Sequence, residues 1–115
     1  MSRRTRYRTI VEENIALYMA RVAKEYNTHF QMALGDNFYV HGIKDEFDKR
    51  FRDTFEDVFK SEYLQTPWFL LMGNHDHYGN ASGQIAYTSH SKRWYIHRES
   101  EYLISFFIIT LLFLL

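Results

Sequence analysis

The chain has 115 residues, and 46% of them are hydrophobic, which is enough apolar material for one domain with a buried core and argues against disorder. Fourteen basic and fourteen acidic residues give a net charge of zero, so the composition offers no electrostatic basis for binding nucleic acid. The sequence contains no cysteine, which excludes disulfide scaffolds, thiolate metal sites and thiol nucleophiles.

The chain begins with a basic segment, residues 1–8, whose arginines are Arg3, Arg4, Arg6 and Arg8. We interpret this segment as a solvated terminal arm, and a targeting signal or a phosphate-contacting tail is the alternative. The residues that follow are charged and amphipathic and do not form an apolar run, so we expect no signal peptide in this stretch.

The first two expected elements are a helix and a strand. From Thr9 to Tyr26, apolar residues recur at spacings of three and four, which predicts an amphipathic helix. Its apolar positions are Val11, Ile15, Tyr18, Met19, Val22 and Tyr26. The short apolar run Phe30–Leu34 then predicts a buried strand that ends in a loop at Gly35 and Asp36.

A second helix, a second strand and a third helix are expected further along the chain. We expect Asp45 to cap the second helix, whose buried face is an aromatic stripe. The stripe consists of Phe47, Phe51, Phe55, Val58 and Phe59. The apolar run Trp68–Met72 predicts the second strand, and residues 82–91 are expected to form the third helix. Because strands that alternate with helices pair in parallel, this α/β pattern places the two loops that follow the strands at one edge of a sheet.

Polar side chains follow both predicted strands. They are Asp36, Asn37 and Tyr39 in the first loop and Asn74, His75, Asp76 and His77 in the second. Carboxylate, amide and imidazole ligands suit zinc, iron or manganese, and a phenolate favours a ferric ion. The alternative is that these residues only cap helices and form turns. Ligands of open α/β sheets bind beyond the carboxyl ends of the strands. The position of these residues after two consecutive strands therefore favours a metal site.

Two stretches carry a resemblance to a known family, LGDNFYVHGIKDEFDKRFRDTFEDVF and PWFLLMGNHDHYGNASGQIAYTSHSKRW. They resemble the tartrate-resistant, type 5 purple acid phosphatases, which belong to the calcineurin-like metallophosphoesterases. The resemblance implies an acid phosphatase that hydrolyses phosphate monoesters at a dinuclear metal centre, Fe(III) with Fe(II) or Zn(II).

The resemblance also implies roles for individual residues. Asp36 is expected to bridge the two metal ions, and Tyr39 to bind the ferric ion as a phenolate. Asn74 is expected to bind the divalent ion through its amide oxygen. His75 is the expected catalytic residue, placed to hydrogen-bond the substrate phosphate or to assist the leaving group. Asp76 and His77 are expected to shape the pocket without binding metal.

Only two of the family's motifs, GDNxxY and GNH[DE], occur in the chain. Residues 9–98 are therefore expected to form a partial calcineurin-like sandwich that lacks its first strand and its C-terminal half. We interpret the chain as a truncated internal fragment whose metal site is incomplete and whose activity is impaired. Such a fragment is expected to expose a sheet edge and apolar faces. The alternative function is that of a non-catalytic fragment or binding module.

The carboxyl-terminal residues 99–115 form an apolar tail, in which Tyr102–Leu115 is a run of fourteen residues without a charge. This run is shorter than the roughly 18–20 residues that a helix needs to cross a bilayer. We therefore weigh three interpretations, namely a buried strand or helix, a short membrane anchor, and a sequence foreign to the domain. The membrane anchor is the least favoured of the functional hypotheses.

An N-glycosylation sequon, Asn80-Ala81-Ser82, follows the second loop. The resemblance implies a secreted or lysosomal protein and so a glycosylated Asn80. The absence of a signal-peptide pattern at the start of the chain conflicts with this expectation.

Overall fold

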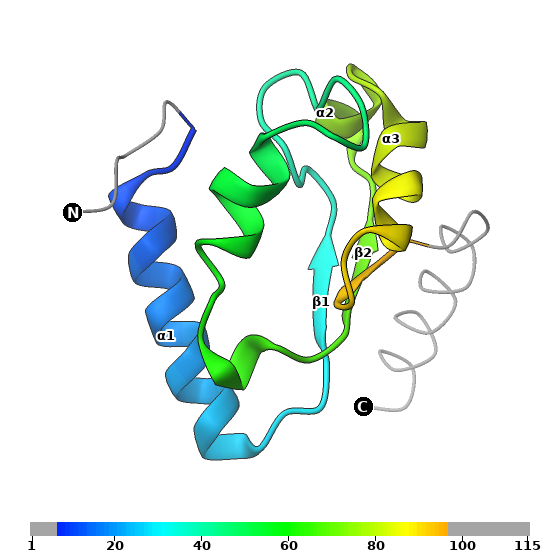
Figure 1. Cartoon of the computed structure of the whole chain (residues 1–115). Coiled ribbons are helices and arrows are strands. Elements are labelled where there is room, and N and C mark those ends of the chain that lie inside the picture. Colours follow the sequence, from blue (N-terminus) through cyan, green and yellow to red (C-terminus); the bar gives the residue numbers. More distant parts are fainter. Residues whose placement is uncertain (1–6, 97–115) are drawn as a thin grey trace, which may run out of the picture.

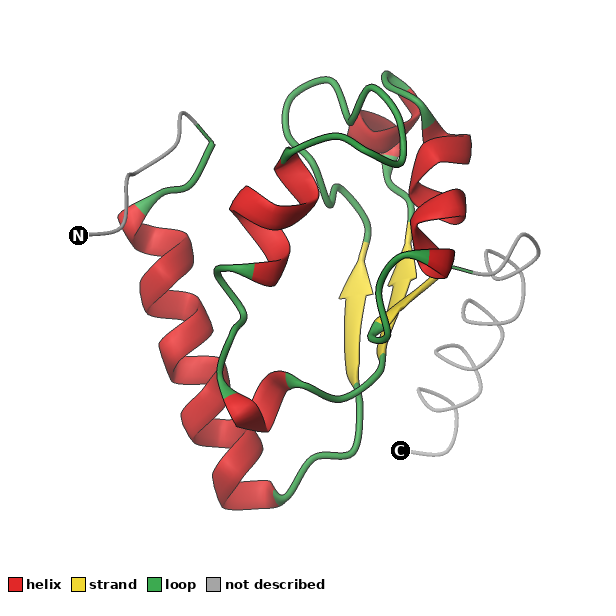
Figure 2. Ribbon diagram, in the orientation of Figure 1, coloured by secondary structure: helices red, strands yellow, loops and turns green. Residues whose placement is uncertain are grey.

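The computed structural model describes residues 7–96, and its elements are shown in Figures 1 and 2. In chain order they are α1 (Ile10–Tyr26), β1 (Gln31–Leu34), the π-helical turn η1 (Arg52–Glu56), the 3-10 turn η2 (Glu62–Leu64), β2 (Trp68–Leu71), α2 (Asn74–His77), α3 (Ala81–Ala86), the 3-10 turn η3 (Tyr87–Ser89) and β3 (Trp94–Tyr95). The strands form one parallel sheet in the order β1-β2-β3, which confirms the α/β architecture. The expected arm falls largely, and the expected tail entirely, outside the described residues.

The long helix α1 has the predicted ends because both are set by local chemistry. The hydroxyl of Thr9 accepts a hydrogen bond of 3.1 Å from the backbone N–H of Glu12, which caps the first turn. At the other end Asn27 adopts a left-handed conformation with φ of 50°, which stops the helix. Arg8, the last residue of the expected arm, lies against this helix and forms an ion pair of 2.6 Å with Glu13.

The buried face of α1 differs from the predicted one. Its buried residues are Ala16, Ala20 and Ala23. Four of the predicted core positions are exposed, namely Val11, Ile15, Tyr18 and Tyr26, while Met19 packs against the core. The prediction was wrong because it weighed hydrophobicity alone, whereas the small alanine side chains form the face that lies against η2 and the core.

The core lies on one face of the sheet and is built largely from aromatic rings. The ring of Phe55, from η1, lies 5.2 Å from that of Trp68 and 4.9 Å from that of Trp94, measured between centroids. Phe51 stacks on Tyr87 at 3.6 Å. Edge-to-face and stacked pairs of this kind contribute specific packing beyond the area that they bury. The ring of Phe55 therefore joins η1 to both β2 and β3.

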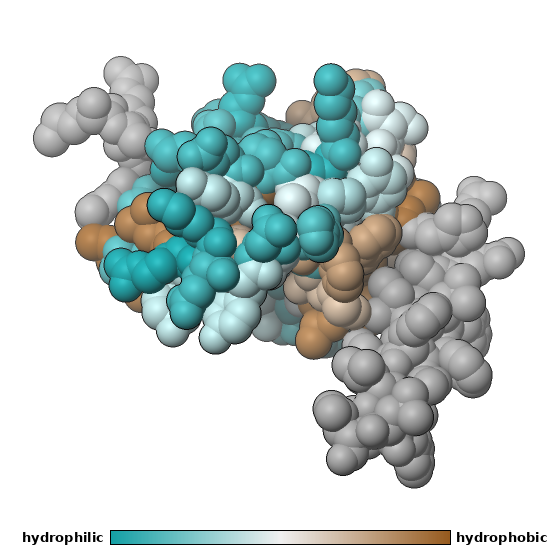
Figure 3. Space-filling model, turned by 90° about the horizontal axis from the view of Figure 1, so that it is seen from below, coloured by the Kyte–Doolittle hydropathy of each residue, from teal (hydrophilic) through white to brown (hydrophobic). Residues whose placement is uncertain are grey.

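The opposite face of the sheet is open. In the register of the strands, Met32 lies beside Phe69, and Phe69 beside Tyr95, so these three side chains form a row across the sheet. Each is between 41% and 43% exposed. In the view of Figure 3, hydrophobic residues reach the surface on both sides of a hydrophilic area. In residues 7–96, β1 also pairs only with β2. The expected apolar face and sheet edge are thus confirmed.

The second predicted helix begins later than expected. Asp45 does not cap it, because its carboxylate accepts a hydrogen bond of 2.8 Å from the N–H of Phe47 in a local turn. Asp48 accepts hydrogen bonds from the backbone N–H groups of Lys44 and Arg50, and regular helical structure starts only after it. Phe47 is 76% exposed and so is not part of the buried stripe.

Three smaller features complete the comparison with the sequence. The expected loop at Asn74–His77 is one helical turn, α2. The expected third helix is divided into α3 and the turn η3. The two-residue strand β3 was not predicted, and it exists because the backbone of Trp94–Tyr95 pairs with β2. Across residues 7–96, no helix is both long and apolar enough to cross a membrane.

Candidate functional site

The loops that follow β1 and β2 meet at the edge of the sheet, as the parallel topology predicts. Leu34 and Leu71 are partners in the register, so the segments after them start side by side. The backbone N–H of His75 donates a hydrogen bond of 3.1 Å to Oδ1 of Asp36. Since Asp36 follows β1 and His75 belongs to α2, this bond joins the two candidate motifs directly.

Asp36 and Tyr39 form a pair within the first loop. The phenol of Tyr39 donates a hydrogen bond of 3.0 Å to Oδ2 of Asp36. This hydrogen bond to the carboxylate is the main cause that raises the pKa of Tyr39 above its usual value, because it favours the protonated phenol. Asp36 itself adopts a left-handed conformation, with φ of 52°, which aspartate tolerates better than most residues.

His75 is held by its backbone and by its ring. Its Nδ1 lies 2.7 Å from the carbonyl oxygen of Val40. A carbonyl oxygen can only accept, so we assign the proton to Nδ1, and Nε2 is the nitrogen left to exchange a proton with a ligand. The ring centroid lies 4.6 Å from that of Tyr39 and 5.4 Å from that of Tyr78. The imidazole is therefore positioned beside the Asp36–Tyr39 pair.

The fourth predicted site residue, Asn74, is less closely tied to the others. It is the first residue of α2 and is exposed, and within residues 7–96 its side chain makes no hydrogen bond. The described part of the chain contains no group of three His, Cys, Asp or Glu side chains that could hold a metal ion. The oxygens of Asp36 and Tyr39, 3.0 Å apart, are close enough to share one ion, so the donor set fits part of a metal site.

Asp76 connects the elements around the site through the hydrogen bonds of its buried carboxylate. It is fully buried, and its carboxylate accepts four hydrogen bonds of 2.8–3.1 Å. The donors are the backbone N–H groups of Asn37, Phe38 and Gly73 and the side-chain amide of Gln84. Asp76 therefore fastens the first loop to α2 and α3. The expectation that Asp76 shapes the pocket stays a prediction.

Sequence reasoning missed Gln84 as a member of this network, although it included Asn37 among the candidate ligands. Gln84 is fully buried, and its Oε1 accepts a hydrogen bond of 3.2 Å from the side chain of Asn37. The same amide of Asn37 donates a hydrogen bond of 2.7 Å to the carbonyl oxygen of Leu71. This bond joins the loop after β1 to the end of β2. The spacing of Gly73 and Asp76, which matches a helix cap, is the one local signal that could have indicated the network.

Gly73 is required because the loops approach so closely. A Cβ atom at this position would lie 2.1 Å from Oδ1 of Asp36 and 2.5 Å from its backbone nitrogen. Since backbone atoms cannot move aside without shifting the loop, any side chain here would displace Asp36. The glycine before the candidate NHDH segment thus allows the contact between the two motifs.

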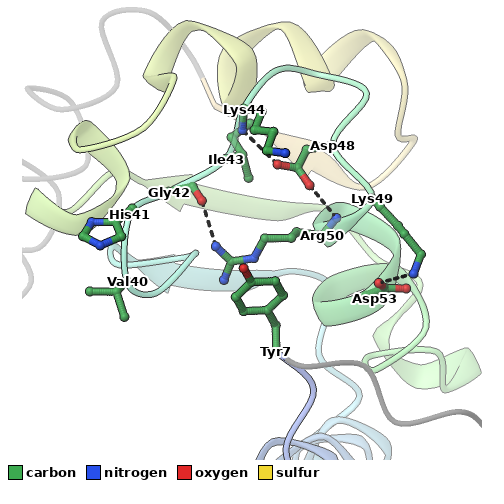
Figure 4. A pocket seen from close by; sticks show the side chains of 10 residues that line it. All are labelled: Tyr7, Val40, His41, Gly42, Ile43, Lys44, Asp48, Lys49, Arg50 and Asp53. Atoms are coloured by element: carbon green, nitrogen blue, oxygen red, sulfur yellow. Dashed lines mark hydrogen bonds and ion pairs between the residues drawn. The ribbon is translucent and has the colours of Figure 1, made fainter.

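Arg50 holds the far side of the first loop (Figure 4). Its guanidinium donates hydrogen bonds to the carbonyl oxygens of Tyr39 and Gly42, the latter at 2.7 Å, and lies 4.1 Å from the ring centroid of Tyr7. Burial lowers the pKa of Arg50, since the charged form loses hydration. The guanidinium borders a pocket of about 590 Å³. Arg50 thus anchors the backbone that carries Tyr39.

The sequon residue Asn80 has a structural role. Its Oδ1 accepts a hydrogen bond of 2.9 Å from the N–H of Gly83 and so caps α3. Its Nδ2 donates a hydrogen bond of 3.1 Å to the carbonyl oxygen of Lys44. Asn80 is exposed, so the position is open to modification, but the amide is already engaged on both sides.

Replacing Asn80 with alanine is expected to lower the free energy of unfolding by about 1 kcal/mol, because the helix cap and the bond to Lys44 are lost. Urea denaturation followed by circular dichroism measures the change. Ser82→Ala is the matched control, since it removes the sequon and leaves the cap in place. If Asn80→Ala is no less stable than Ser82→Ala, the capping role is refuted.

Comparisons with known proteins identify the family. The model of the calcineurin-like phosphoesterase family matches residues 10–112. The chain is 51% identical over 89 residues to tartrate-resistant acid phosphatase type 5 of Mus musculus and 49% identical over 89 residues to that of Homo sapiens. It is 35% identical over 85 residues to purple acid phosphatase 4 of Arabidopsis thaliana.

These alignments cover most of the chain but a small part of each relative. They span 76% of the chain and 27% of the two mammalian proteins, and 72% of the chain and 25% of the plant protein. Among solved structures, GAP50, described as the anchor in the inner membrane complex of Plasmodium, matches with a TM-score of 0.69 and 24% identity. That match covers 77% of the chain and 30% of the other protein, and it supports the fold alone.

Proposed function

Since the chain belongs to the calcineurin-like phosphoesterase family, we propose that it carries part of a dinuclear metal site for the hydrolysis of phosphate monoesters. The observation that supports this best is the convergence of the two motifs on Asp36, which accepts hydrogen bonds from Tyr39 and from the backbone of His75. The relatives named as acid phosphatases support phosphoester hydrolysis as the chemistry of the family.

In this proposal Asp36, Tyr39 and Asn74 hold the metal ions, Fe(III) with Fe(II) or Zn(II). A metal pair supplies Lewis-acid activation of water and neutralises charge on the transferring phosphoryl group. The residues of the chain hold and orient the donor atoms. The contact between Asp36 and α2 fixes the carboxylate, and the anchoring of Tyr39 by Arg50 fixes the phenol. Asn74 stands next to His75 and brings an amide oxygen to the same edge of the sheet.

His75 acts on the substrate in this proposal. Its Nδ1 proton is directed at the carbonyl oxygen of Val40, so the imidazolium form, which carries a second proton on Nε2, would donate a hydrogen bond from Nε2 to a phosphate oxygen or give that proton to the leaving oxygen. The contact with Val40 restricts rotation of the ring, which favours one orientation of Nε2. His75 therefore serves as the catalytic residue, and the Val40 carbonyl positions it.

The chain alone is proposed to be impaired. Residues 7–96 offer a carboxylate, a phenol and an amide at the site and no cluster of three acidic or histidine ligands, too few donors for two ions. The chain also spans about a quarter of the length of the curated relatives that it matches. The same observations favour the second candidate function, a non-catalytic fragment or binding module that keeps the fold.

Ferric iron is expected to bind through Tyr39 and Asp36 and to give a visible tyrosinate absorption band, while a metal pair is not retained during gel filtration. The wild-type chain is measured by absorption spectroscopy and metal analysis after addition of Fe(III) with Fe(II) or Zn(II). Tyr39→Phe is the matched control, because it removes only the phenolic oxygen. A band of equal strength in Tyr39→Phe would exclude this residue as the ligand.

Hydrolysis of a simple phosphate monoester by the metal-treated chain provides the second readout. The wild type is expected to show little or no activity above His75→Ala. If its activity clearly exceeds that of His75→Ala, the chain is not impaired and the phosphatase proposal is strengthened. If Tyr39 gives no band and no activity is measurable, the non-catalytic alternative is the better description.

The location of the protein and its modification follow the same proposal. A secreted or lysosomal location would allow glycosylation of Asn80, which is exposed. Membrane tethering by the apolar tail is a weaker alternative, because Tyr102–Leu115 is shorter than the roughly 20 residues of a membrane-spanning helix. Alkaline carbonate extraction separates these possibilities, since only an anchored chain stays with the membranes.

A further inference from the structure

The pocket of about 590 Å³ that Arg50 borders lies beside the first loop (Figure 4). Its walls include Val40 from this loop and Tyr7 from the residues before α1. The proposed metal ligands and His75 are not among the residues that line it. Small-molecule sites in proteins have volumes of roughly 300–1,000 Å³. The pocket is therefore large enough for a small organic ligand and is distinct from the proposed metal site.

The charged side chains that line the pocket leave positive charge without an ion pair. They are Lys44, Asp48, Lys49, Arg50 and Asp53, whose formal charges sum to +1. Lys49 and Asp53 form an ion pair of 3.1 Å. Both carboxylate oxygens of Asp48 accept hydrogen bonds from backbone N–H groups, those of Lys44 and Arg50. Within residues 7–96, the side chains of Lys44 and Arg50 form no ion pair.

The guanidinium of Arg50 keeps unused donors at this wall. It has five N–H donors and uses two of them, for the carbonyl oxygens of Tyr39 and Gly42. Its Nε is buried and has no hydrogen-bond partner in the described part of the chain. A cation that is partly removed from water is stabilised by a nearby anion. An anion in the pocket would supply the charge that the described residues do not.

We propose that this pocket binds a small organic phosphate, with the phosphoryl group beside Lys44 and Arg50 and the organic part against Tyr7 and Val40. A phosphoryl group carries about two negative charges at neutral pH, which matches the two cations without an ion pair. Guanidinium donors also suit the oxygens of a phosphoryl group. Tyr7 and Val40 are 44% and 56% exposed, so both can contact an apolar ligand.

The position of the pocket gives this second site a place relative to the first. The carbonyl oxygen of Val40 contacts Nδ1 of His75, and Val40 also lines the pocket. A ligand in the pocket would thus lie beside the loop segment that positions His75. The proposal goes beyond the phosphatase function, because binding in the pocket requires neither a metal ion nor His75.

Titration of the metal-free, full-length chain with phenylphosphonate tests the proposal, since this probe carries a ring and an anionic group that cannot be hydrolysed. Binding is followed by nuclear magnetic resonance of the ¹⁵N-labelled chain, and the amide signals of His41, Lys44 and Arg50 are expected to shift. Lys44→Glu is expected to raise the dissociation constant at least about tenfold. Lys44→Met, which removes the charge without reversing it, is expected to raise it by about threefold.

Lys92→Glu is the matched control for Lys44→Glu. Lys92 is exposed and does not line the pocket, and its substitution changes the net charge of the chain by the same amount. It is expected to change the dissociation constant by less than about twofold, because exposed charges at a distance are screened by salt. His75→Ala is expected to bind the probe as the wild type does. The result is therefore independent of whether iron binds to the chain.

Two related probes separate the parts of the ligand. Methylphosphonate lacks the ring and is expected to bind about fivefold more weakly, because it makes no contact with the apolar walls. Benzyl alcohol has the ring without the charge and is expected not to bind. Equal affinities for phenylphosphonate and methylphosphonate would contradict an organic ligand and assign the pocket to a free oxyanion.

Two further outcomes would overturn the proposal. An equal loss of affinity in Lys44→Glu and Lys92→Glu would mean that the probe is attracted by net charge and has no specific site. Loss of binding in His75→Ala together with unchanged binding in Lys44→Glu would place the probe at the proposed phosphatase site and leave the pocket without a ligand.

Discussion

Replacing Asp76 with alanine is expected to lower the free energy of unfolding by about 4 kcal/mol, the largest change from any single substitution considered. The carboxylate is fully buried and accepts four hydrogen bonds. Without it, the backbone N–H groups of Asn37, Phe38 and Gly73 remain inside the protein without an acceptor. Urea unfolding followed by far-ultraviolet circular dichroism gives the change, which is expected as a shift in the midpoint at constant slope.

Asp45→Ala is the matched control for Asp76→Ala. Asp45 is exposed, and its carboxylate accepts one local hydrogen bond, from Phe47. Its removal is expected to cost no more than about 1 kcal/mol. If both variants lose the same stability, the network around Asp76 does not hold the two loops together. A further readout is iron binding, which is expected to decrease in Asp76→Ala and not in Asp45→Ala.

Replacing Arg93 with methionine is expected to lower the free energy of unfolding by about 3 kcal/mol. The side chain of Arg93 is 6% exposed, and its Nε forms an ion pair of 3.1 Å with Glu56. Its guanidinium also donates to the carbonyl oxygens of Phe59 and Leu64 and lies 4.4 Å from the ring centroid of Phe55. Methionine keeps the packing volume but leaves these acceptors without a donor.

Lys92→Met serves as the control for Arg93→Met, because Lys92 is the neighbouring cation and is exposed. Its substitution is expected to change stability by less than about 0.5 kcal/mol. Thermal unfolding at neutral pH distinguishes the two variants. A loss in Arg93→Met no greater than that in Lys92→Met would show that the buried ion pair and its hydrogen bonds contribute nothing to stability.

The sequence predicts the features whose causes are local. Thr9 and Asn27 set the ends of α1 through a cap and a left-handed turn, and both signals lie within a few residues of the helix. The two apolar runs predict the positions of β1 and β2 because each has a strand's length and ends at a glycine. The expected burial of the first run is wrong, because Phe30, Met32 and Leu34 lie on the open face of the sheet and are exposed. The meeting of the loops follows from the rule that alternating strands and helices pair in parallel.

The features that the sequence could not predict depend on distant partners. Asp76 and Asn37 are 39 residues apart, and Gln84 reaches both, so no local pattern indicates that all three share one network. β3 is only two residues long and exists through pairing with β2. The buried face of α1 depends on which side approaches the core, a choice that alanine's small size decides and hydropathy does not show.

The candidate site could be predicted from the sequence only in part. Asp36, Tyr39 and His75 could be placed together from their position after the strands, and the structure brings these three into contact. Their roles as ligands and catalyst stay predictions. Asn74 was placed beside them by sequence order alone, and its side chain has no hydrogen bond to them.

The anchoring of the first loop by Arg50 has a consequence for how this surface can vary. The guanidinium donates hydrogen bonds to the backbone carbonyl oxygens of Tyr39 and Gly42. These contacts fix the backbone of the loop and do not depend on the side chains of the residues between them. Val40 and His41 are both exposed. Substitutions at these two positions can change the size, charge or polarity that the loop presents to solvent while Tyr39 stays in place. The exposed positions 40 and 41 can therefore change in sequence, whereas the buried Asp76 cannot change without loss of the contacts that hold the loops together.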